Sequence, residues 1–317
     1  MERALSETAK VTLPALMDLT GLPPWVSVIV KAGHRGLRAV SPPLRELPVT
    51  LPLMMTDDSA RLAARALYTA WQTGRPLDGL PDSLRPADVA AGYRVQRALD
   101  ELLGTPVGWK IGATGEGAQQ LLGVAGPFYG RLFESFVVAD GGTLPALPAT
   151  MFIAEAEFAF RLGSDLPAEQ APFSRSDVLA AVAAVVPALE LPDSRFGDFR
   201  ALGAPQLVAD DACARFIVLG PACTDWDPDA LADHAVSILV NGLEAARGNG
   251  GTVLGNPCTA LVWLANELAA TGLSLRAGDI VMSGSCAVPN TIRAGDYLEA
   301  DFGTLGRVSV TLPDPPA

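Results

Sequence analysis

The chain has 317 residues, a formal net charge of −12, and 49% hydrophobic residues. Length and composition are typical of a globular protein with one large domain or two, and exclude a disordered chain. The negative charge argues against nucleic acid as a partner, because phosphate binding requires a basic surface. Since no apolar run reaches the ~18 to 20 residues of a membrane span and no signal peptide is evident, we expect a cytoplasmic protein without a membrane partner.

Cysteine and histidine chemistry is poorly supported. The four cysteines have neither metal-ligand nor disulfide spacing and are interpreted as incidental thiols: Cys213, Cys223, Cys258 and Cys286. Of the two histidines, His34 lies in an atypical first segment, and His234 lies in a helical-looking run, 228–239, where it is interpreted as a helix-surface residue. An enzyme built on this chain would therefore rely on carboxylates, lysine, hydroxyl groups and water.

The first segment, residues 1–53, is rich in proline and has no sustained hydrophobic period. We expect it to be a poorly ordered extension or an upstream start. Helical periodicity then begins after a good N-cap cluster at Thr56–Ser59 and continues in two helices, 59–73 and 88–103. Residues 54–105 are thus predicted to be a helical lead-in to a catalytic domain, 106–317.

Lys110 is the first candidate functional residue. From Met54 onward the chain has sixteen arginines and this single lysine. The two residue types are interchangeable on a solvated surface, but only lysine offers a compact ammonium whose pKa can be lowered and whose proton can be moved. Because Lys110 lies in an apolar run, 107–113, we predict a functional lysine on a buried strand.

The run 151–162 carries two acids among apolar and aromatic residues and is predicted to be a strand. Side chains alternate faces in a strand, so Glu155 and Glu157 point to the same side, roughly 6 to 7 Å apart. Two buried carboxylates repel each other and lose hydration unless a cation lies between them. The pattern therefore predicts a bound divalent metal.

The next elements bring a third acid. A helix is predicted over 114–123 and a turn at Gly141–Gly142. Ser174–Asp177 is then expected to cap a helix over about 178–186, which Pro187 ends. The following residues continue as an extended segment and place Glu190 in an apolar context.

The C-terminal part is strand-rich. An amphipathic helix is predicted over 259–270, and strands are predicted over 215–220, 236–240, 279–283, 297–302 and 307–312. Since helices and strands do not alternate as in βαβ units, we expect an α+β fold built on a curled, mainly antiparallel sheet with flanking helices.

Five ordered motifs carry a family resemblance. They are Gly108–Gly112, Gly130–Phe133, Glu155–Ala159, Pro187–Glu190 followed by Asp193–Arg195, and Ala277–Ile280 before Ser283–Gly284. From about Met54 to the C-terminus the chain resembles the hydratase/decarboxylase branch of the fumarylacetoacetate hydrolase superfamily. That branch contains 2-hydroxypenta-2,4-dienoate (2-oxopent-4-enoate) hydratase and 4-oxalocrotonate decarboxylase.

The resemblance implies a mixed β-roll fold with a Mg²⁺ or Mn²⁺ site held by Glu155, Glu157 and Glu190. Oxygen ligands without a nearby histidine agree with a hard octahedral ion. About three coordination positions would remain for water and a chelating 2-oxo acid. Lys110 would hydrogen-bond the 2-oxygen or shuttle a proton while an enolate, stabilised by the ion, forms and collapses.

Several reactions are compatible with this chemistry. Hydration of a 2-hydroxypenta-2,4-dienoate or 2-oxopent-4-enoate is the leading expectation. The alternatives are decarboxylation of a 4-oxalocrotonate-type acid, C–C hydrolysis of an acylpyruvate, and a non-catalytic partner subunit, against which the retained glutamates and Lys110 argue. The paired acids fit glycoside hydrolysis only superficially. A homo-oligomer, and association with an enzyme of the same pathway, are expected by resemblance.

Other site residues follow from the same comparison. Gly112, Thr114 and Ser285 are predicted to bind substrate, Ser285 through the substrate carboxylate. Three positions depart from the hydratases: Ser135 replaces an acid, Asp211 replaces Asn, and Arg215 replaces a small residue. Ser135 is a candidate catalytic residue. Arg215 is either a ligand for a second substrate carboxylate or a surface arginine at the start of a strand.

Overall fold

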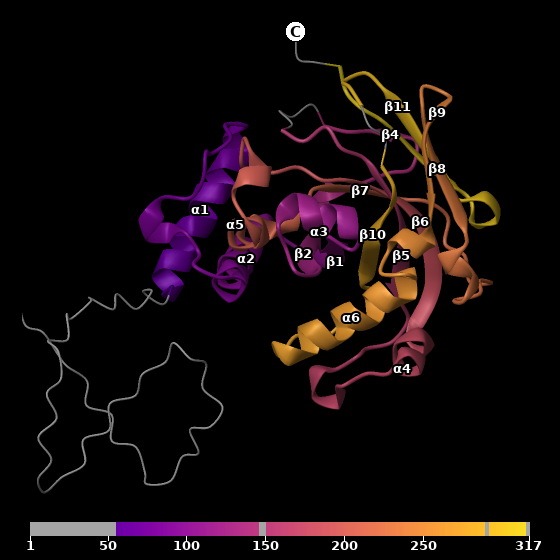
Figure 1. The fold of residues 1–317 in the computed structure, drawn as a ribbon, viewed down its shortest axis with the longest axis horizontal. Coiled ribbons are helices and arrows are strands. Elements are labelled where there is room, and N and C mark those ends of the chain that lie inside the picture. The colour runs from indigo at the N-terminus through magenta and orange to yellow at the C-terminus, as the bar shows by residue number, and fades with distance from the viewer. Residues whose placement is uncertain (1–54, 146–149, 289–291, 315–317) are drawn as a thin grey trace, which may run out of the picture. The chain divides into compact units, whose positions relative to one another are not determined.

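The computed structural model describes residues 55–145, 150–288 and 292–314 (Figure 1). All of the described residues belong to one compact unit. The predicted extension, residues 1–53, lies outside them. The α-helices are α1 (Asp57–Thr73), α2 (Val89–Leu103), α3 (Glu116–Leu122), α4 (Arg175–Ala180), α5 (Ala204–Ala209) and α6 (Pro257–Ala270). Within the described ranges no helix is long and apolar enough to cross a membrane.

The two helices of the predicted lead-in are confirmed as α1 and α2. The hydroxyl of Thr56 accepts a hydrogen bond from the Ser59 amide and caps α1, and Asp88 caps α2 through the Ala91 amide. Their apolar faces pack together, and α2 also packs against α5 (Figure 1). The lead-in therefore packs against α5, which lies in the segment before β7. This segment leads toward the candidate site.

Close packing between α2 and α5 depends on Gly92. A Cβ at this position would lie 2.5 Å from the carbonyl oxygen of Pro205. We expect Gly92→Ala to lower the free energy of unfolding by roughly 1 to 3 kcal/mol, because overpacking against backbone outweighs the better helix propensity of alanine. Gly117→Ala in α3, where a Cβ meets nothing within 4 Å, should instead stabilise by about 0.5 to 1 kcal/mol. Urea denaturation of both variants tests the contrast, and equal effects would contradict it.

A seven-stranded sheet carries the candidate site. Its order is β2-β1-β10-β5-β6-β7-β3, from the strands β1 (Pro106–Gly112), β2 (Phe128–Phe133), β3 (Val137–Val138), β5 (Glu155–Leu162), β6 (Val182–Leu191), β7 (Phe216–Leu219) and β10 (Ile280–Ala287). The edge strands β2 and β3 are joined only by a three-residue turn, η2 (Glu134–Phe136). Because three residues span at most ~10 Å, the sheet must curl until its two edges approach each other.

A second, five-stranded sheet has the order β4-β12-β11-β8-β9. Its strands are β4 (Gly142–Thr143), β8 (Ala235–Val240), β9 (Leu243–Asn249), β11 (Tyr297–Asp301) and β12 (Arg307–Thr311). Among the described strands, β1 with β10, β3 with β7 and β4 with β12 pair in parallel, and all other pairs are antiparallel. The prediction of a curled, mainly antiparallel α+β fold with flanking helices is confirmed, with the strands divided between two sheets.

The main hydrophobic core lies on one face of the seven-stranded sheet. It joins Phe158 and Phe160 of β5 to α6 and to strands of the second sheet, and α6 runs beside β10 in Figure 1. A smaller cluster, which includes Ala159 and Met282, occupies the opposite face. Glu155 and Glu157 share that opposite face, as the alternation predicted, so the sheet separates the acids from the aromatic core.

The predicted helix over 178–186 is wrong. Ser174 does cap a helix, with a capping box to Asp177, but α4 ends at Ala180 and β6 begins at Val182. A short apolar run of this kind is ambiguous between helix and strand. The run forms a strand because it pairs with β5 on one side and with β7 on the other. Pro187 lies within this strand, opposite Phe158.

The predicted helical run around His234 is also wrong. Only a 3₁₀ turn, Ala230–Ala232, forms before β8. His234 lies between them, with Nε2 2.6 Å from the carbonyl oxygen of Phe302 and its ring edge-on to Phe158. A helix over 228–239 would remove residues 235–240 from the β8 ladder, so sheet pairing again overrides helix propensity. The predictions of α3, α6 and the later strands are confirmed.

Candidate metal centre and active site

Strand register brings the three predicted acids together. Glu155 of β5 pairs directly with Glu190 of β6, and Glu157 lies two residues further along β5 on the same face. One carboxylate oxygen from each residue lies within 4.8 Å of the others. Glu157 and Glu190 are fully buried, and Glu155 is partly exposed. These three residues are called the glutamate trio below.

The trio is poorly supplied with hydrogen-bond donors. Glu157 Oε2 accepts a 2.8 Å hydrogen bond from the Gly284 amide. Within the described chain, Glu157 Oε1 and both oxygens of Glu190 accept none. Burial, and then the charge of Glu190, raises the pKa of Glu155 to about 7, and the same causes raise the pKa of Glu157 well above its usual value. The fold therefore carries a concentration of negative charge that it does not itself neutralise.

A divalent ion fits this arrangement. The three carboxylates and the neighbouring Lys110 ammonium sum to two negative charges, which one divalent cation balances. All donors are carboxylate oxygens, and this donor set favours Mg²⁺, Mn²⁺ or Ca²⁺ over softer metals. The orphaned oxygens of Glu157 and Glu190 are the atoms that such an ion would engage.

Lys110 is buried in the middle of β1, between β2 and β10. Its Nζ donates a 3.1 Å hydrogen bond to the carbonyl oxygen of Ala212 and lies 3.2 Å from Glu190 Oε1. The contact with Glu190 is an ion pair without the geometry of a hydrogen bond. Burial alone would lower the pKa of Lys110, but Glu190, Glu155 and Glu157 raise it above its ordinary value.

Ser285 and Thr114, two of the three residues predicted to bind substrate, lie near Glu157. Ser285 is opposite Glu157 in the pairing of β10 with β5. Gly284 has a φ of 111°, and a Cβ there would lie 2.1 Å from Thr114 Oγ1, so the segment after β1 contacts the backbone that binds Glu157. Gly112 ends β1 two residues beyond Lys110. The hydroxyl of Ser285 is buried and has no partner in the described chain, which leaves it free to bind a ligand.

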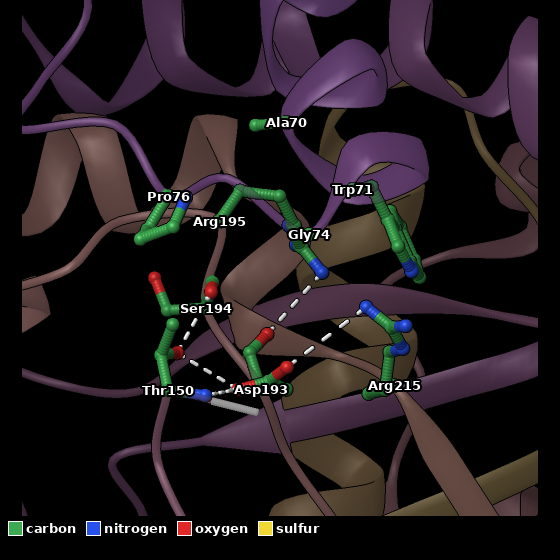
Figure 2. A pocket seen from close by; sticks show the side chains of 9 residues that line it. All are labelled: Ala70, Trp71, Gly74, Pro76, Thr150, Asp193, Ser194, Arg195 and Arg215. Atoms are coloured by element: carbon green, nitrogen blue, oxygen red, sulfur yellow. Dashed lines mark hydrogen bonds and ion pairs between the residues drawn. The ribbon is translucent and has the colours of Figure 1, made fainter. Parts of the chain in front are cut away.

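Arg215 lies in a different cavity, of about 110 Å³ (Figure 2). The cavity is lined by Ala70, Trp71, Gly74, Pro76, Thr150, Asp193, Ser194, Arg195 and Arg215. The Arg215 guanidinium lies 4.5 Å from the Trp71 ring centroid and 3.9 Å from Asp193 Oδ2, and its buried Nε has no partner in the described ranges. Burial, and then the charge of Arg195, lowers the pKa of Arg215 to about 10.

Arg215 is therefore not a surface arginine, and it does not contact the glutamate trio. The cavity is nevertheless close to the trio in the sheet. Asp193 follows Glu190 by three residues, and Arg215 precedes Ile217, which pairs with Glu190. Two strand residues span ~6 to 7 Å.

Ser135 is exposed in η2 and makes no side-chain hydrogen bond within the described residues. Its neighbour Phe136 stacks on Trp71, with ring centroids 4.6 Å apart, and lies 5.7 Å from the Arg215 guanidinium. Ser135 is thus next in sequence to a residue that packs near Trp71 and Arg215. Its catalytic role stays a prediction.

Sequence reasoning missed the backbone groups that complete the site. The Ala212 carbonyl binds Lys110, and the Gly284 amide binds Glu157. Neither residue has a functional side chain, so composition cannot reveal them. The unusual Asp211 is the sequence signal that lies next to Ala212.

Comparison with known proteins agrees with this geometry. The family model described as fumarylacetoacetate (FAA) hydrolase C-terminal matches residues 126–312, which include all three glutamates. The chain belongs to the fumarylacetoacetate hydrolase family. Among curated members of related sequence, 2-keto-4-pentenoate hydratase of Burkholderia vietnamiensis is 35% identical over 263 residues, covering 81% of this chain and 99% of the relative. The 2-hydroxyhexa-2,4-dienoate hydratase of Comamonas testosteroni is 36% identical, covering 77% and 94%.

A solved structure extends the similarity to the fold. The 4-oxalocrotonate decarboxylase from Pseudomonas putida G7, complexed with magnesium and adipate, superposes with a TM-score of 0.74 at 26% identity, covering 82% of this chain and 99% of the decarboxylase. The same decarboxylase has also been solved with calcium and acetate. The family resemblance inferred from the five motifs is thereby confirmed, for both the hydratase and the decarboxylase members.

Proposed function

We propose that the chain is a divalent-metal-dependent hydro-lyase that adds water to 2-hydroxypenta-2,4-dienoate or the corresponding 2-oxopent-4-enoate. The observation that carries the proposal is the glutamate trio beside the buried Lys110. Mg²⁺ or Mn²⁺ is the proposed ion, because the donor set is made of hard oxygens. The names of the curated relatives support hydration as the reaction.

The ion, when bound, would supply Lewis acidity toward the substrate carboxylate and 2-oxygen. Glu155, Glu157 and Glu190 would hold it, and the Gly284 amide fixes one oxygen of Glu157 in place. Lys110 is held at the same face by Ala212 and Glu190, so its ammonium can donate a hydrogen bond to the 2-oxygen or move a proton as the dienol becomes a ketone. Water then adds across the conjugated double bond and gives a hydroxy 2-oxo acid.

Residues near Glu157 are proposed to orient the substrate. The Ser285 hydroxyl, which has no hydrogen-bond partner in the part of the chain that the structure describes, is proposed to donate to the substrate carboxylate. Thr114, which contacts the Gly284 backbone, and Gly112 at the end of β1 are proposed to set the position of the reacting carbons. Buried donors held by packing lose little freedom on binding, and this preorganisation is what an electrostatic site requires.

Decarboxylation of a 4-oxalocrotonate-type acid is the second candidate, and the Arg215 cavity is the observation that favours it. The buried Arg215 guanidinium, whose Nε has no partner among the described residues, directly precedes β7 and could bind the second carboxylate of a dicarboxylic substrate. The structural neighbour solved with adipate supports this alternative. Hydrolysis of an acylpyruvate is a weaker candidate than hydration or decarboxylation. Formation of an oligomer and association with a partner enzyme stay predictions from the family resemblance.

One assay separates these reactions. The purified full chain with Mg²⁺ or Mn²⁺ is incubated with 2-hydroxypenta-2,4-dienoate or with 4-oxalocrotonate, while dienol absorbance and CO₂ are followed. We expect loss of the dienol without CO₂. Release of CO₂ from 4-oxalocrotonate would support the decarboxylase instead, and in that case Arg215→Met should raise KM for this dicarboxylic acid at least ~10-fold. Turnover of neither acid by metal-loaded protein would contradict both candidates.

A further inference from the structure

Three consecutive residues next to the site have a left-handed backbone. Asp211, Ala212 and Cys213 have φ values of 53°, 52° and 59°, and none of them is glycine. All three are buried. Such conformations are costly for residues with a Cβ and persist only where the surrounding structure enforces them. This segment is called the Asp211 turn below.

Two sets of contacts hold the Asp211 turn. On its N-terminal side, the Asp210 carboxylate binds the Arg195 guanidinium and accepts a 2.7 Å hydrogen bond from Ser194 Oγ. Within the turn, Asp211 Oδ1 accepts a 2.7 Å hydrogen bond from the backbone amide of Arg131 in β2. The turn is therefore tied both to the segment that follows β6 and to β2, two strands that are not neighbours in the sheet.

The approach to β2 is close. A Cβ at Gly130, the residue before Arg131, would lie 2.4 Å from the Asp211 carbonyl oxygen. Gly130 pairs with Lys110 across β2 and β1. The Asp211 turn thus lies against β2 at the residue that pairs with Lys110. The next carbonyl in the turn, that of Ala212, accepts the hydrogen bond from Lys110 Nζ.

We propose that Asp211 is a positioning residue, whose bond to the β2 backbone holds the Asp211 turn in its left-handed form and thereby aims the Ala212 carbonyl at Lys110. The inference rests on the proposed role of Lys110 in proton transfer. An ammonium has three donors and rotates freely on a flexible stem. The fixed Ala212 carbonyl accepts one of these donors, and the charge of Glu190, 3.2 Å from Nζ, holds the ammonium beside the glutamate trio.

An amide can replace the Asp211 carboxyl in this role. Asn tolerates the left-handed conformation, and its side-chain oxygen can accept from the Arg131 amide. Burial, and then the charge of Asp100, raises the pKa of Asp211 well above its usual value. Asp211→Asn should therefore preserve the turn. Asp211→Ala loses the side-chain oxygen that accepts from the Arg131 amide and also the tolerance for a left-handed backbone. Asp211→Gly loses only the side-chain oxygen.

Asn241 supplies a matched control. It is another non-glycine residue with a left-handed backbone, φ 52°, and its Oδ1 accepts a 2.9 Å hydrogen bond from the Tyr297 amide on a neighbouring strand. It lies in the β8–β9 turn of the second sheet. Asn241→Ala thus removes the same kind of contact without touching the segment that binds Lys110, and should lower stability while leaving turnover within ~2-fold of wild type.

The test compares these variants in the metal-loaded full chain on whichever acid the wild type converts. We expect kcat to fall 10- to 100-fold in Asp211→Ala and Asp211→Gly, because a displacement of about 1 Å can cost ~100-fold. KM should change less than ~3-fold, and Asp211→Asn should restore kcat to within ~3-fold. If Asp211→Ala does not fold, Asp211→Gly decides. A wild-type kcat in Asp211→Gly, or a loss in Asp211→Asn equal to that in Asp211→Gly, would overturn the inference.

A second readout does not depend on turnover. The chain has three lysines, Lys10, Lys31 and Lys110, so ¹³C labelling of lysine side chains gives one signal from Lys110, identified by its loss in Lys110→Arg. That signal should shift or broaden in Asp211→Gly and keep its wild-type position in Asp211→Asn and Asn241→Ala. An unchanged Lys110 signal in Asp211→Gly contradicts the positioning role even if the wild type converts neither acid, whereas a shifted signal with no wild-type turnover would count against the proposed function alone.

Discussion

Lys110→Arg is expected to keep its fold and its metal but to lose at least ~100-fold in kcat, within the range that a positioned proton donor contributes. The guanidinium is planar, larger than the ammonium and permanently protonated. It cannot occupy the space between the Ala212 carbonyl and Glu190 with the same geometry, and it cannot release a proton. Turnover of the dienol measures the loss in kcat. Thermal unfolding with and without Mg²⁺ shows whether the variant keeps its fold and its metal.

The reverse exchange on the surface is the control for Lys110→Arg. Arg247 is exposed and pairs only with Glu244 in the described chain. Arg247→Lys should change neither kcat nor stability appreciably, because an exposed ion pair contributes about 0 to 1 kcal/mol. A Lys110→Arg enzyme that retained more than half of wild-type kcat would remove lysine from the mechanism.

Glu155→Gln is expected to shift the stability of the metal-free and metal-loaded protein in opposite directions. Without metal, the substitution removes one of three like charges that lie close together, so the variant should be at least as stable as wild type. At an ion concentration 100 times the Kd, wild type should gain about 2.7 kcal/mol. The variant should gain less than ~1 kcal/mol and should lose dienol turnover, because a neutral amide is a poor ligand for a hard cation.

Differential scanning calorimetry with and without Mg²⁺ measures both shifts. Glu169→Gln is the control, since Glu169 is an exposed acid in a 3₁₀ turn, Ala168–Gln170, and should leave the gain from Mg²⁺ unchanged. If Glu155→Gln bound Mg²⁺ as tightly as wild type and turned over the dienol at the wild-type rate, the assignment of the glutamate trio as the metal site would be refuted.

The site was predictable from sequence where it depends on local rules. Alternation along β5 placed Glu155 and Glu157 on one face, and the lone lysine drew attention to Lys110. Glu190 was recognised in an extended segment, although the apolar run before it was misread as helix. That run becomes β6 because β5 and β7 pair with it on both sides, and pairing between distant strands cannot be read from a local window.

The remainder of the site depends on tertiary contacts that residue types do not encode. The Ala212 and Gly284 backbone groups act through conformation rather than through side chains. The direction of Arg215 was left open by the sequence, and packing against Trp71 decided it. Division of the strands into two sheets likewise follows from long-range pairing, such as that of β4 with β12.

The order of strands has a consequence for how the protein is made. β10 lies between β1 and β5 in the sheet, although it follows both of them by a long stretch of chain. A nascent polypeptide that has not yet released β10 from the ribosome lacks the strand that pairs with both β1 and β5. Lys110 and the three acids therefore become neighbours at a late stage of synthesis. We expect nascent chains to bind the metal ion only when they are nearly complete. Binding of the ion would then show that the sheet has formed.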